Sequence, residues 1–526
     1  MSLGTADIAV LVAYFVGTVT IGLWFGRGER NTTDFFLGGR RQHWLVVGLS
    51  IIATEVSALT FLIVPGRSYE GNWWYLQMYV GSFVGRLLIV YMLLPAFYGG
   101  SVTTVYEYLG QRFGPWTRTV AALMFFASRI IGSGIRLLAA SLALAIVFDW
   151  PLAWVVVGAA AIAVTYTTFG GIKAIIWTDA FQALVFAGAA VAVVVFLLRA
   201  IPGAWIDNLS TLSASGKLQV FHWEGGANNV KLFWVLMISS TVQTMAALGA
   251  DQDMTQRMLT CPDLRRGQRS LIFNAFLGLP VVCVFLLVGS LVHQYYAVGA
   301  GGGTPVGESG QQDRIFAHFI ATALPVGYGL KGLLVAGIFA AAMSSLDSAL
   351  GALSSSAVTD FYRPIVVLLR RRSARAKARS SGDSGADDPM TAGPGGGSDD
   401  RRELRVARAC TIVFGVLLAW VALAFADSKQ LLEDAFGWVG LIFGGMLGVF
   451  VLGVTTTGRG GDRLNVFAML SSVGVLIGIK YAQERSGVVY LAWPWWVVVG
   501  TTWTYLVGVC CPTAAVEPRS ETGAPG

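Results

Sequence analysis

Two apolar segments of the sequence, 44–64 and 329–361, carry clusters of oxygen-bearing side chains near their centres. These side chains are Thr54, Glu55, Ser57 and Thr60 in the first segment and Ser344, Ser345, Asp347 and Ser348 in the second. A bare carboxylate in lipid is unfavourable by about 2.5–3.5 kcal/mol on insertion scales, so Glu55 and Asp347 require partners. A hard cation such as sodium prefers several oxygen ligands, and hydroxyls plus freed backbone carbonyls supply them where a membrane helix is interrupted. The two clusters therefore favour a cation site, and helix packing through small residues is the alternative.

Other charged side chains also lie inside apolar segments. Arg129 and Arg136 are seven residues apart, which places them on one face of a helix. For these two residues, internal pairing, such as Arg136 with Glu55, and binding of an anionic ligand are equally open. Arg86 is a third arginine in an apolar segment. Asp179 lies about one and a half turns inside its segment, close enough to the end for water to hydrate its carboxylate.

Only helices that cross a bilayer can position these side chains. Of the 526 residues, 55% are hydrophobic and 13% are charged, against about 25% charged in an ordinary soluble domain. Segments long and apolar enough to cross a hydrocarbon core about 30 Å thick recur along the chain. They are 6–26, 44–64, 74–98, 116–147, 151–168, 174–199, 231–251, 268–295, 329–361, 406–425, 431–454, 463–482 and 491–512. The sequence therefore predicts an all-α polytopic membrane protein with about 13 transmembrane helices.

Basic residues gather in alternate loops, among them 27–41, 257–269 and 370–404. The positive-inside rule places these loops in the cytoplasm, so the N-terminus lies outside and the C-terminus lies in the cytoplasm. Loop 370–404 is rich in Arg, Ser, Gly and Asp, which predicts a disordered tether. The segment 201–230 is expected to be an extracellular loop that lies across the mouth of the protein, and 513–526 an unstructured tail.

The remaining composition argues against several other classes of protein. The net charge of +7 comes from basic residues confined to short loops, so it does not indicate nucleic-acid binding. The five cysteines have the spacing of neither a metal site nor a disulfide framework. The four histidines show no metal-site or nucleophile–base spacing, so we expect no enzyme activity; they are His43, His222, His293 and His318. The sequence gives no sign of an obligate protein partner.

Five motifs, in order along the chain, resemble those of the sodium:solute symporter family. They are DFFLGGR at 34–40, YEYLGQRFG at 106–114, GGIKAIIWTDAFQ at 170–182, DQDMTQR at 251–257 and AGIFAAAMSSLDSALGALSSSAVTDFY at 336–362. The resemblance implies a LeuT-like core of two inverted repeats of five helices. The repeats would be 31–200 and 231–456, with one extra helix in 1–30 before them and two in 457–512 after them.

The resemblance also implies a principal sodium site. In that family, two carbonyls of the first core helix and one carbonyl and two adjacent hydroxyls of the eighth hold the ion. The matching positions are Ala53, Val56, Ala341, Ser344 and Ser345.

Some family members hold a second sodium ion near the cytoplasm. The matching positions, Asp179, Ser344 and Ser348, are accompanied here by Asp347, so this site could take a cation or share a proton. Glu55 stands where a relative has a functional Asp, which implies a role near the ion or the gate.

For the substrate, the resemblance implies a carboxylate rather than a galactose-type sugar. The sugar-binding Gln, Asn and Lys of the family are replaced by Thr60, Thr244 and Gly278. Hydroxyls at Ser57 and Thr60 match those that hold a substrate carboxylate in sialic acid symporters. The remaining predicted substrate residues are Gln77, Arg129, Arg136 and Thr244.

The resemblance thus implies sodium-coupled uptake of a small organic solute by alternating access at the plasma membrane. The solute would be a sialic acid-like sugar acid, a monocarboxylate or an amino acid, and the partners would be this solute, sodium ions and the lipid bilayer. One alternative is a proton-coupled or uncoupled carrier of the same fold, with Glu55, Asp179 and Asp347 as proton sites. The other is a transporter-like membrane sensor, which the lack of a predicted folded cytoplasmic module disfavours.

Overall fold

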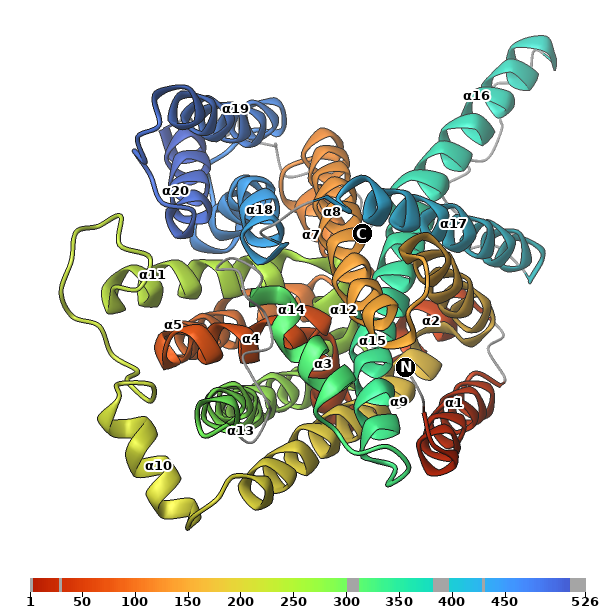
Figure 1. Cartoon of the computed structure of the whole chain (residues 1–526). Helices are drawn as coiled ribbons and strands as arrows, with labels where there is room; N and C mark the ends of the chain where they lie inside the picture. Colours follow the sequence, from red (N-terminus) through yellow and green to blue (C-terminus); the bar gives the residue numbers. More distant parts are fainter. Residues whose placement is uncertain (1–2, 28–30, 300–311, 382–396, 428–430, 511–526) are drawn as a thin grey trace.

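The computed structural model describes residues 3–27, 31–299, 312–381, 397–427 and 431–510 (Figure 1). These residues form helices joined by loops, and no β-strand occurs among them. Nine of the described helices are long and apolar enough to cross a membrane, and one bent helix pair raises the number to ten. The predicted all-α membrane architecture is confirmed.

Every predicted span coincides with helical structure. The first half of the chain contains α1 (Thr5–Phe25), α2 (Thr32–Leu37), η1 (Gly38–Arg40), α3 (Trp44–Glu55), α4 (Ala58–Glu70), η2 (Trp73–Leu76), α5 (Gln77–Leu88), η3 (Ile89–Leu93), α6 (Leu94–Gly99), α7 (Val105–Arg112), α8 (Pro115–Phe148), α9 (Leu152–Ala200) and α10 (Trp205–Ala214). The second half contains α11 (Phe233–Thr244), η4 (Met245–Ala250), α12 (Gln252–Leu259), α13 (Leu264–Ala297), α14 (Gln312–Thr322), α15 (Leu330–Ser356), η5 (Ala357–Tyr362), α16 (Arg363–Ser381), α17 (Gly397–Ala424), α18 (Leu431–Thr455), α19 (Asp462–Ser486) and α20 (Pro494–Cys510). The predicted spans beyond the ten long ones correspond to shorter apolar helical stretches, which are Leu152–Thr165 of α9, Val439–Thr455 of α18 and the 17-residue helix α20.

The helix predicted to open the first repeat is broken between α3 and α4. Trp44–Glu55 and Thr60–Glu70 differ in direction by 57°. At the break, Val56 and Ser57 leave helical geometry, with ψ angles of 73° and 177°. The last carbonyls of α3 therefore have no amide partner within the helix and can serve as ligands.

The helix predicted to open the second repeat is broken in the same manner. The π-helical turn η4 ends at Ala250, and the backbone of the next residue, Asp251, is extended (φ −91°, ψ 127°). The Asp251 carboxylate then caps α12 by accepting the N–H of Asp253 over 2.9 Å. Each interruption thus divides its helix into two shorter segments.

The helix α9 unites two predicted spans, 151–168 and 174–199. Gly171 separates them, because its φ of +52° and ψ of −171° are not helical. A positive φ of this kind favours glycine, which lacks a Cβ. The backbone at Gly171 thus divides α9 into two helical segments, as the sequence predicts.

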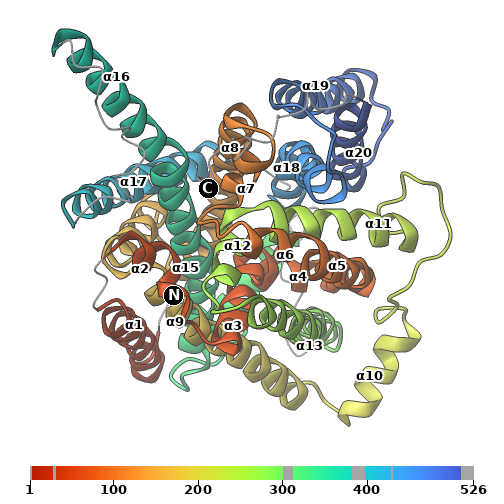
Figure 2. The same ribbon diagram turned by 180° about the vertical axis from the view of Figure 1, so that it is seen from behind.

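The helix α15 lies at the centre of the molecule and has most of its surface covered. In the most apolar 18-residue stretch of Leu330–Arg370, which includes α15, 89% of the residues are buried. Figures 1 and 2 show it surrounded by other helices when viewed from opposite sides. Its alanine and serine side chains permit this close packing on all faces. The predicted cation-site serines are therefore held on a central helix.

Two loop predictions need correction or refinement. Loop 370–404 was expected to be disordered, but the chain is helical through Ser381 and again from Gly397; the part at 382–396 lies outside the described residues. The helix α16 projects from the bundle in both views (Figures 1 and 2). Within 201–230, Lys217 Nζ donates to the Tyr69 carbonyl over 2.7 Å, so this segment packs against the end of α4.

Candidate functional site

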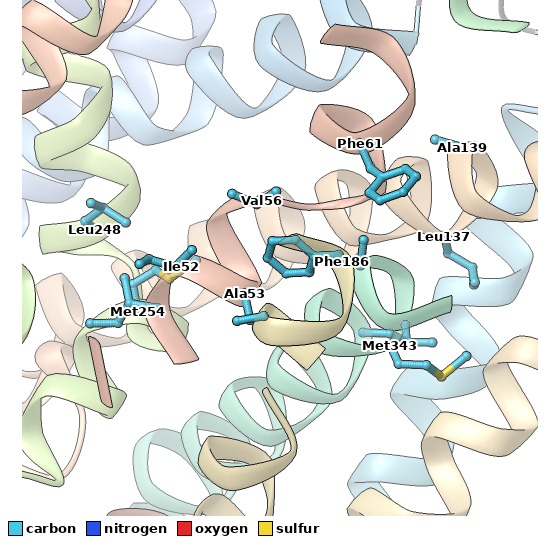
Figure 3. Packing of buried hydrophobic residues seen from close by; sticks show 14 of the residues in the cluster. Ile52, Ala53, Val56, Phe61, Leu137, Ala139, Phe186, Leu248, Met254 and Met343 are labelled. Atoms are coloured by element: carbon cyan, nitrogen blue, oxygen red, sulfur yellow. The ribbon is translucent and has the colours of Figure 1, made fainter. Parts of the chain in front are cut away.

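The break after α3 lies against α15, so the two oxygen-rich segments of the sequence meet. The Ser344 hydroxyl donates to the carbonyl oxygen of Ala53 over 2.8 Å. The neighbouring Ser345 hydroxyl donates to the Ala341 carbonyl over 3.3 Å. Val56, the fifth predicted ligand, is buried at the end of α3, and Figure 3 shows it on the extended stretch that leads toward Phe61.

This set of oxygens suits a hard monovalent cation. Each predicted ligand is a backbone carbonyl or a hydroxyl, and Ala53, Ala341 and Ser344 are fully buried. Hard cations prefer oxygen ligands, and carbonyls freed by a broken helix are typical sodium ligands in transporters. A buried ion bound here would replace its water shell with protein oxygens.

A cavity of about 170 Å³ adjoins the break. It lies among α3, α4, α5, α8, α11, η4 and α18, and seven of the predicted site residues line it. These are Glu55, Val56, Ser57, Thr60, Arg129, Arg136 and Thr244. The structure therefore brings most of the predicted substrate residues to one place, directly beside the predicted cation site.

Arg129 is held by carboxylates of α12 and its cap. Its guanidinium pairs with Asp251 and, over 3.0 Å, with Asp253 Oδ2. Of the two roles left open for this arginine, internal pairing is the one that the structure shows. Arg129 therefore contributes a neutralised charge to the cavity.

Arg136 differs from Arg129 although it lies on the same helix face. Its Nη1 is buried and has no hydrogen-bond partner among the described residues. The suggested pair with Glu55 is wrong, since Glu55 pairs with Arg86. Arg136 thus lines the cavity without an ion pair among the described residues, although Asp251 and Asp253 lie close enough to attract its charge.

Glu55 belongs to a polar cluster that joins α3, α5 and α13. Besides its ion pair with Arg86, it accepts Asn274 Nδ2 over 3.1 Å. Arg86 Nε donates to Asn274 Oδ1 over 2.8 Å, and Arg86 also bonds to Ser82. The Ser82 hydroxyl is 2.7 Å from that of Thr244, which extends the cluster to α11. Both carboxylate oxygens of Glu55 therefore have partners.

Asp179 is fully buried, so the expectation that water hydrates it is wrong. Its Oδ2 accepts Ser50 Oγ over 2.7 Å and Arg257 Nη2 over 2.9 Å. Arg257 also pairs with Asp253, and the Ser348 hydroxyl reaches Asp253 Oδ2 over 3.4 Å. The other oxygen of Asp179, Oδ1, is buried without a hydrogen-bond partner in the described parts of the chain.

Asp347 and Gln77 are the remaining two predicted site residues, and only Gln77 lies away from its expected place. The buried carboxylate of Asp347 accepts the N–H of Ser348 over 2.7 Å. Gln77 does not line the cavity. Its amide donates to the carbonyls of Trp74 and Lys231 and accepts the N–H of His222 in the segment 201–230. Gln77 is thus removed from the predicted substrate residues.

Several residues of the site were not singled out by sequence reasoning. Asp251, Asp253 and Arg257 were quoted as part of a motif but given no role. One feature of the sequence could have pointed to them: their charged side chains stand two and four residues apart at the end of an apolar segment. Gln243 and Tyr79 line the cavity, but single polar residues in an apolar helix gave no pattern that points to them.

Comparison with known proteins identifies the family. The family model described as "Sodium:solute symporter family" matches residues 35–381. The chain belongs to the sodium:solute symporter family. The sequence prediction of this family is confirmed.

The curated relatives are transporters of similar length or somewhat longer. The sodium/sialic acid symporter SiaT of Proteus mirabilis is 27% identical over 489 residues, covering 91% of this chain and 90% of the relative. The human sodium-coupled monocarboxylate transporter 2 is also 27% identical, covering 85% of this chain and 68% of the relative.

Among solved structures, a Na+-coupled sialic acid symporter in a substrate-bound, outward-open state has the same fold. It superposes with a TM-score of 0.80 at 25% sequence identity, over 97% of this chain and 98% of that one. The predicted fold class is therefore confirmed over nearly the whole chain.

Proposed function

We propose that this protein is a sodium-coupled symporter that takes up a small organic anion. The observation that carries the proposal is the hydrogen bond between Ser344 and the Ala53 carbonyl, because it joins the interrupted helix to the central helix α15. The ion would be held by the carbonyls of Ala53, Val56 and Ala341 and by the hydroxyls of Ser344 and Ser345. Membership of a family of sodium-coupled symporters supports this assignment.

The positive charge of Arg136 supports an anionic substrate. A charge that is buried and unpaired is unfavourable, so binding of a carboxylate at Arg136 gains more than binding of a neutral group. The unbonded hydroxyls of Ser57 and Thr60 line the same cavity and can donate to that carboxylate. Sialic acid and monocarboxylates, which named relatives carry, both have such a group.

A second site is proposed around Asp179, Asp347 and Ser348. The partnerless oxygen of Asp179 can accept either a cation or a proton. The hydroxyl of Ser348 and the carboxylate of Asp179 are linked through Asp253 and Arg257, so a charge bound at one would affect the others. Glu55 is proposed to act near the gate, since it borders the cavity at the helix break.

The proposed location is the plasma membrane, with the N-terminus outside and the C-terminus in the cytoplasm. The alternating basic loops of the sequence support this orientation. With it, α3 and α12 form the cytoplasmic halves of the two broken helices, and α4 and α11 form the outer halves. Uptake would follow when access to the central cavity alternates between the two sides.

Uptake into proteoliposomes, driven by a sodium gradient at fixed pH, tests the proposal. Ser345→Ala should raise the sodium concentration for half-maximal uptake about tenfold or more, which corresponds to about 1.4 kcal/mol of lost ion binding. Ser354→Ala is a matched control, because Ser354 is a buried serine of α15 whose hydroxyl bonds, within the described parts of the chain, only to the Gly351 carbonyl. Uptake that follows a proton gradient and ignores sodium would instead identify a proton-coupled carrier.

A further inference from the structure

A chain of buried ion pairs joins the central cavity to the proposed second site. Arg129 of α8 lines the cavity and pairs with Asp253 of α12. Asp253 also pairs with Arg257, one turn further along α12, and Arg257 pairs with Asp179 of α9. None of these four side chains is more than 6% exposed. The cavity is therefore connected to the carboxylate of the proposed second site through buried charges only.

Asp253 has the central place in this chain, because its two oxygens have different partners. Its Oδ1 pairs with Arg257. Its Oδ2 lies 3.0 Å from Arg129 Nη1 and also accepts the Ser348 hydroxyl over 3.4 Å. That hydroxyl is divided between Asp253 Oδ2 and the Ser345 carbonyl, which is equally distant. One oxygen atom of Asp253 therefore contacts both an arginine of the cavity and a hydroxyl of the proposed second site.

Both ends of the chain carry polar atoms that lack a partner. At the cavity, Arg129 Nε and Arg136 Nη1 are buried and make no hydrogen bond with any residue that the structure describes. At the other end, the same holds for the acceptor Asp179 Oδ1. Desolvated donors without partners favour an anion, and a desolvated carboxylate oxygen without one favours a cation or a proton. The two ends thus suit ligands of opposite charge.

We propose that Asp253 couples binding of the anionic substrate in the cavity to binding of a cation at the second site. An anion held by Arg129 Nε and Arg136 competes with Asp253 for the positive charge of Arg129. Asp253 Oδ2 then carries a less compensated negative charge beside Ser348, which favours a cation there. The effect is strong because water is excluded from the ion pairs.

Thermodynamic linkage requires the same coupling in the opposite direction. A cation at the second site attracts Asp253 Oδ2 and leaves Arg129 more available to the anion. Asp253 acts through Arg129 and Ser348, so it is a positioning residue. This inference rests on the proposed sodium-coupled uptake of an organic anion and adds the residue through which the two ligands affect each other.

Asp253→Asn separates this coupling from a purely structural role of the ion pairs. The amide removes the negative charge but keeps the shape of the side chain. Arg129 retains Asp251 as a partner and Arg257 retains Asp179, so no arginine is left without a carboxylate. The variant is therefore expected to fold.

Asp251→Asn is the matched control, because it makes the same exchange two residues away. The Asp251 side chain pairs with Arg129 and caps α12, as an asparagine can. Within the described parts of the chain it bonds to neither Arg257 nor Ser348. This variant changes the surroundings of Arg129 without touching the connection to the second site.

Calorimetric titration of the purified, full-length protein measures the coupling. N-acetylneuraminate and L-lactate serve as anion probes at low and at high sodium, with potassium keeping the ionic strength constant. The ratio of the two dissociation constants of a probe is its coupling factor. Asp253→Asn should lower this factor about fivefold or more, whereas Asp251→Asn should change it by less than about twofold, whatever its effect on the affinity itself.

A second measurement needs no anion. Sodium that binds the folded protein raises its melting temperature by mass action. Asp253→Asn should raise the sodium concentration for half-maximal stabilisation about threefold or more, because a negative charge beside Ser348 is lost. Ser348→Ala leaves every ion pair in place and should act in the same direction, which keeps the test valid if Asp253→Asn fails to fold. The effects in the double variant should be less than additive, since both changes remove one contact.

The inference is overturned if Asp253→Asn and Asp251→Asn change the coupling factor and the sodium requirement equally, or if neither Asp253→Asn nor Ser348→Ala changes them. Additive effects of Asp253→Asn and Ser348→Ala also overturn it. If neither anion binds, the sodium requirement alone decides. Failure of the proposed function gives a different result, because sodium and potassium then stabilise the unaltered protein equally.

Discussion

The buried carboxylate of Glu55 is stabilised by two partners in the membrane interior. Glu55 has both oxygens occupied, by Arg86 and by the amide of Asn274. Arg86 is almost fully buried and has no access to water of its own. The pair therefore stabilises the fold near the cavity only as long as both members are present. Loss of one member should lower the stability of the protein by a measurable amount.

Glu55→Ala should destabilise the protein by about 3–5 kcal/mol, because it leaves Arg86 as an uncompensated buried cation. Glu55→Gln should cost less, since the amide oxygen can still accept a hydrogen bond from Arg86. Denaturant unfolding of the detergent-solubilised variants would measure both. Glu70→Ala is the control: Glu70 lies exposed on α4, and its loss should change stability by no more than about 0.5 kcal/mol.

At the scale of elements, close helix contacts fix the geometry of the broken helix. The helix α13 packs against α4 so closely that a Cβ at Gly289 would overlap the carbonyl oxygen of Pro65. The Ser68 hydroxyl bonds to the Leu286 carbonyl over 2.7 Å at the same contact. The backbones of α4 and α13 are thus in direct contact at this point. This contact fixes the direction that the chain takes after the break.

Gly289→Ala should therefore push α4 and α13 apart and destabilise the protein by about 1–3 kcal/mol. The comparison is Gly474→Ala on α19, where a Cβ would meet no atom within 4 Å. Alanine there should be neutral or slightly stabilising, because it favours the helix over the unfolded chain. Equal melting temperatures for the two variants would contradict the close approach of α4 and α13.

Most of these elements could be predicted from the sequence, because long apolar runs determine where helices cross a membrane. The break after Glu55 was implied by the family resemblance, whereas the hydroxyls of Ser57 and Thr60 by themselves indicated only a polar site in mid-segment. The sequence expectation of disorder was wrong for 370–381, because composition alone does not register that a long helix can continue from the membrane into a charged segment.

At the scale of the whole molecule, the charge pairs join helices that are distant in the sequence. Arg129 and Asp251 are separated by 122 residues, and Asp179 and Arg257 by 78. Hydropathy and periodicity report on one helix at a time, so they place Arg129 inside an apolar segment and Asp179 near the end of one, but they name the partner of neither. The same reason explains why Gln77 was assigned to the substrate and why Gln243 was overlooked.

The whole molecule has an orientation in the membrane that cysteine labelling can measure. Ser213→Cys places a thiol at an exposed position of α10, and Ser373→Cys places one at an exposed position of the projecting helix α16. The background should carry serine in place of Cys510 and Cys511, because Cys510 is exposed.

With the proposed orientation, an impermeant maleimide added to intact cells labels the thiol at 213 at once, but labels the thiol at 373 only after the membrane is opened. The basic residues around position 373 predict this result, since they resist transfer across the bilayer. Labelling of the position on α16 in intact cells would show that the molecule is inserted the other way, with α3 and α12 on the outer side of the cavity.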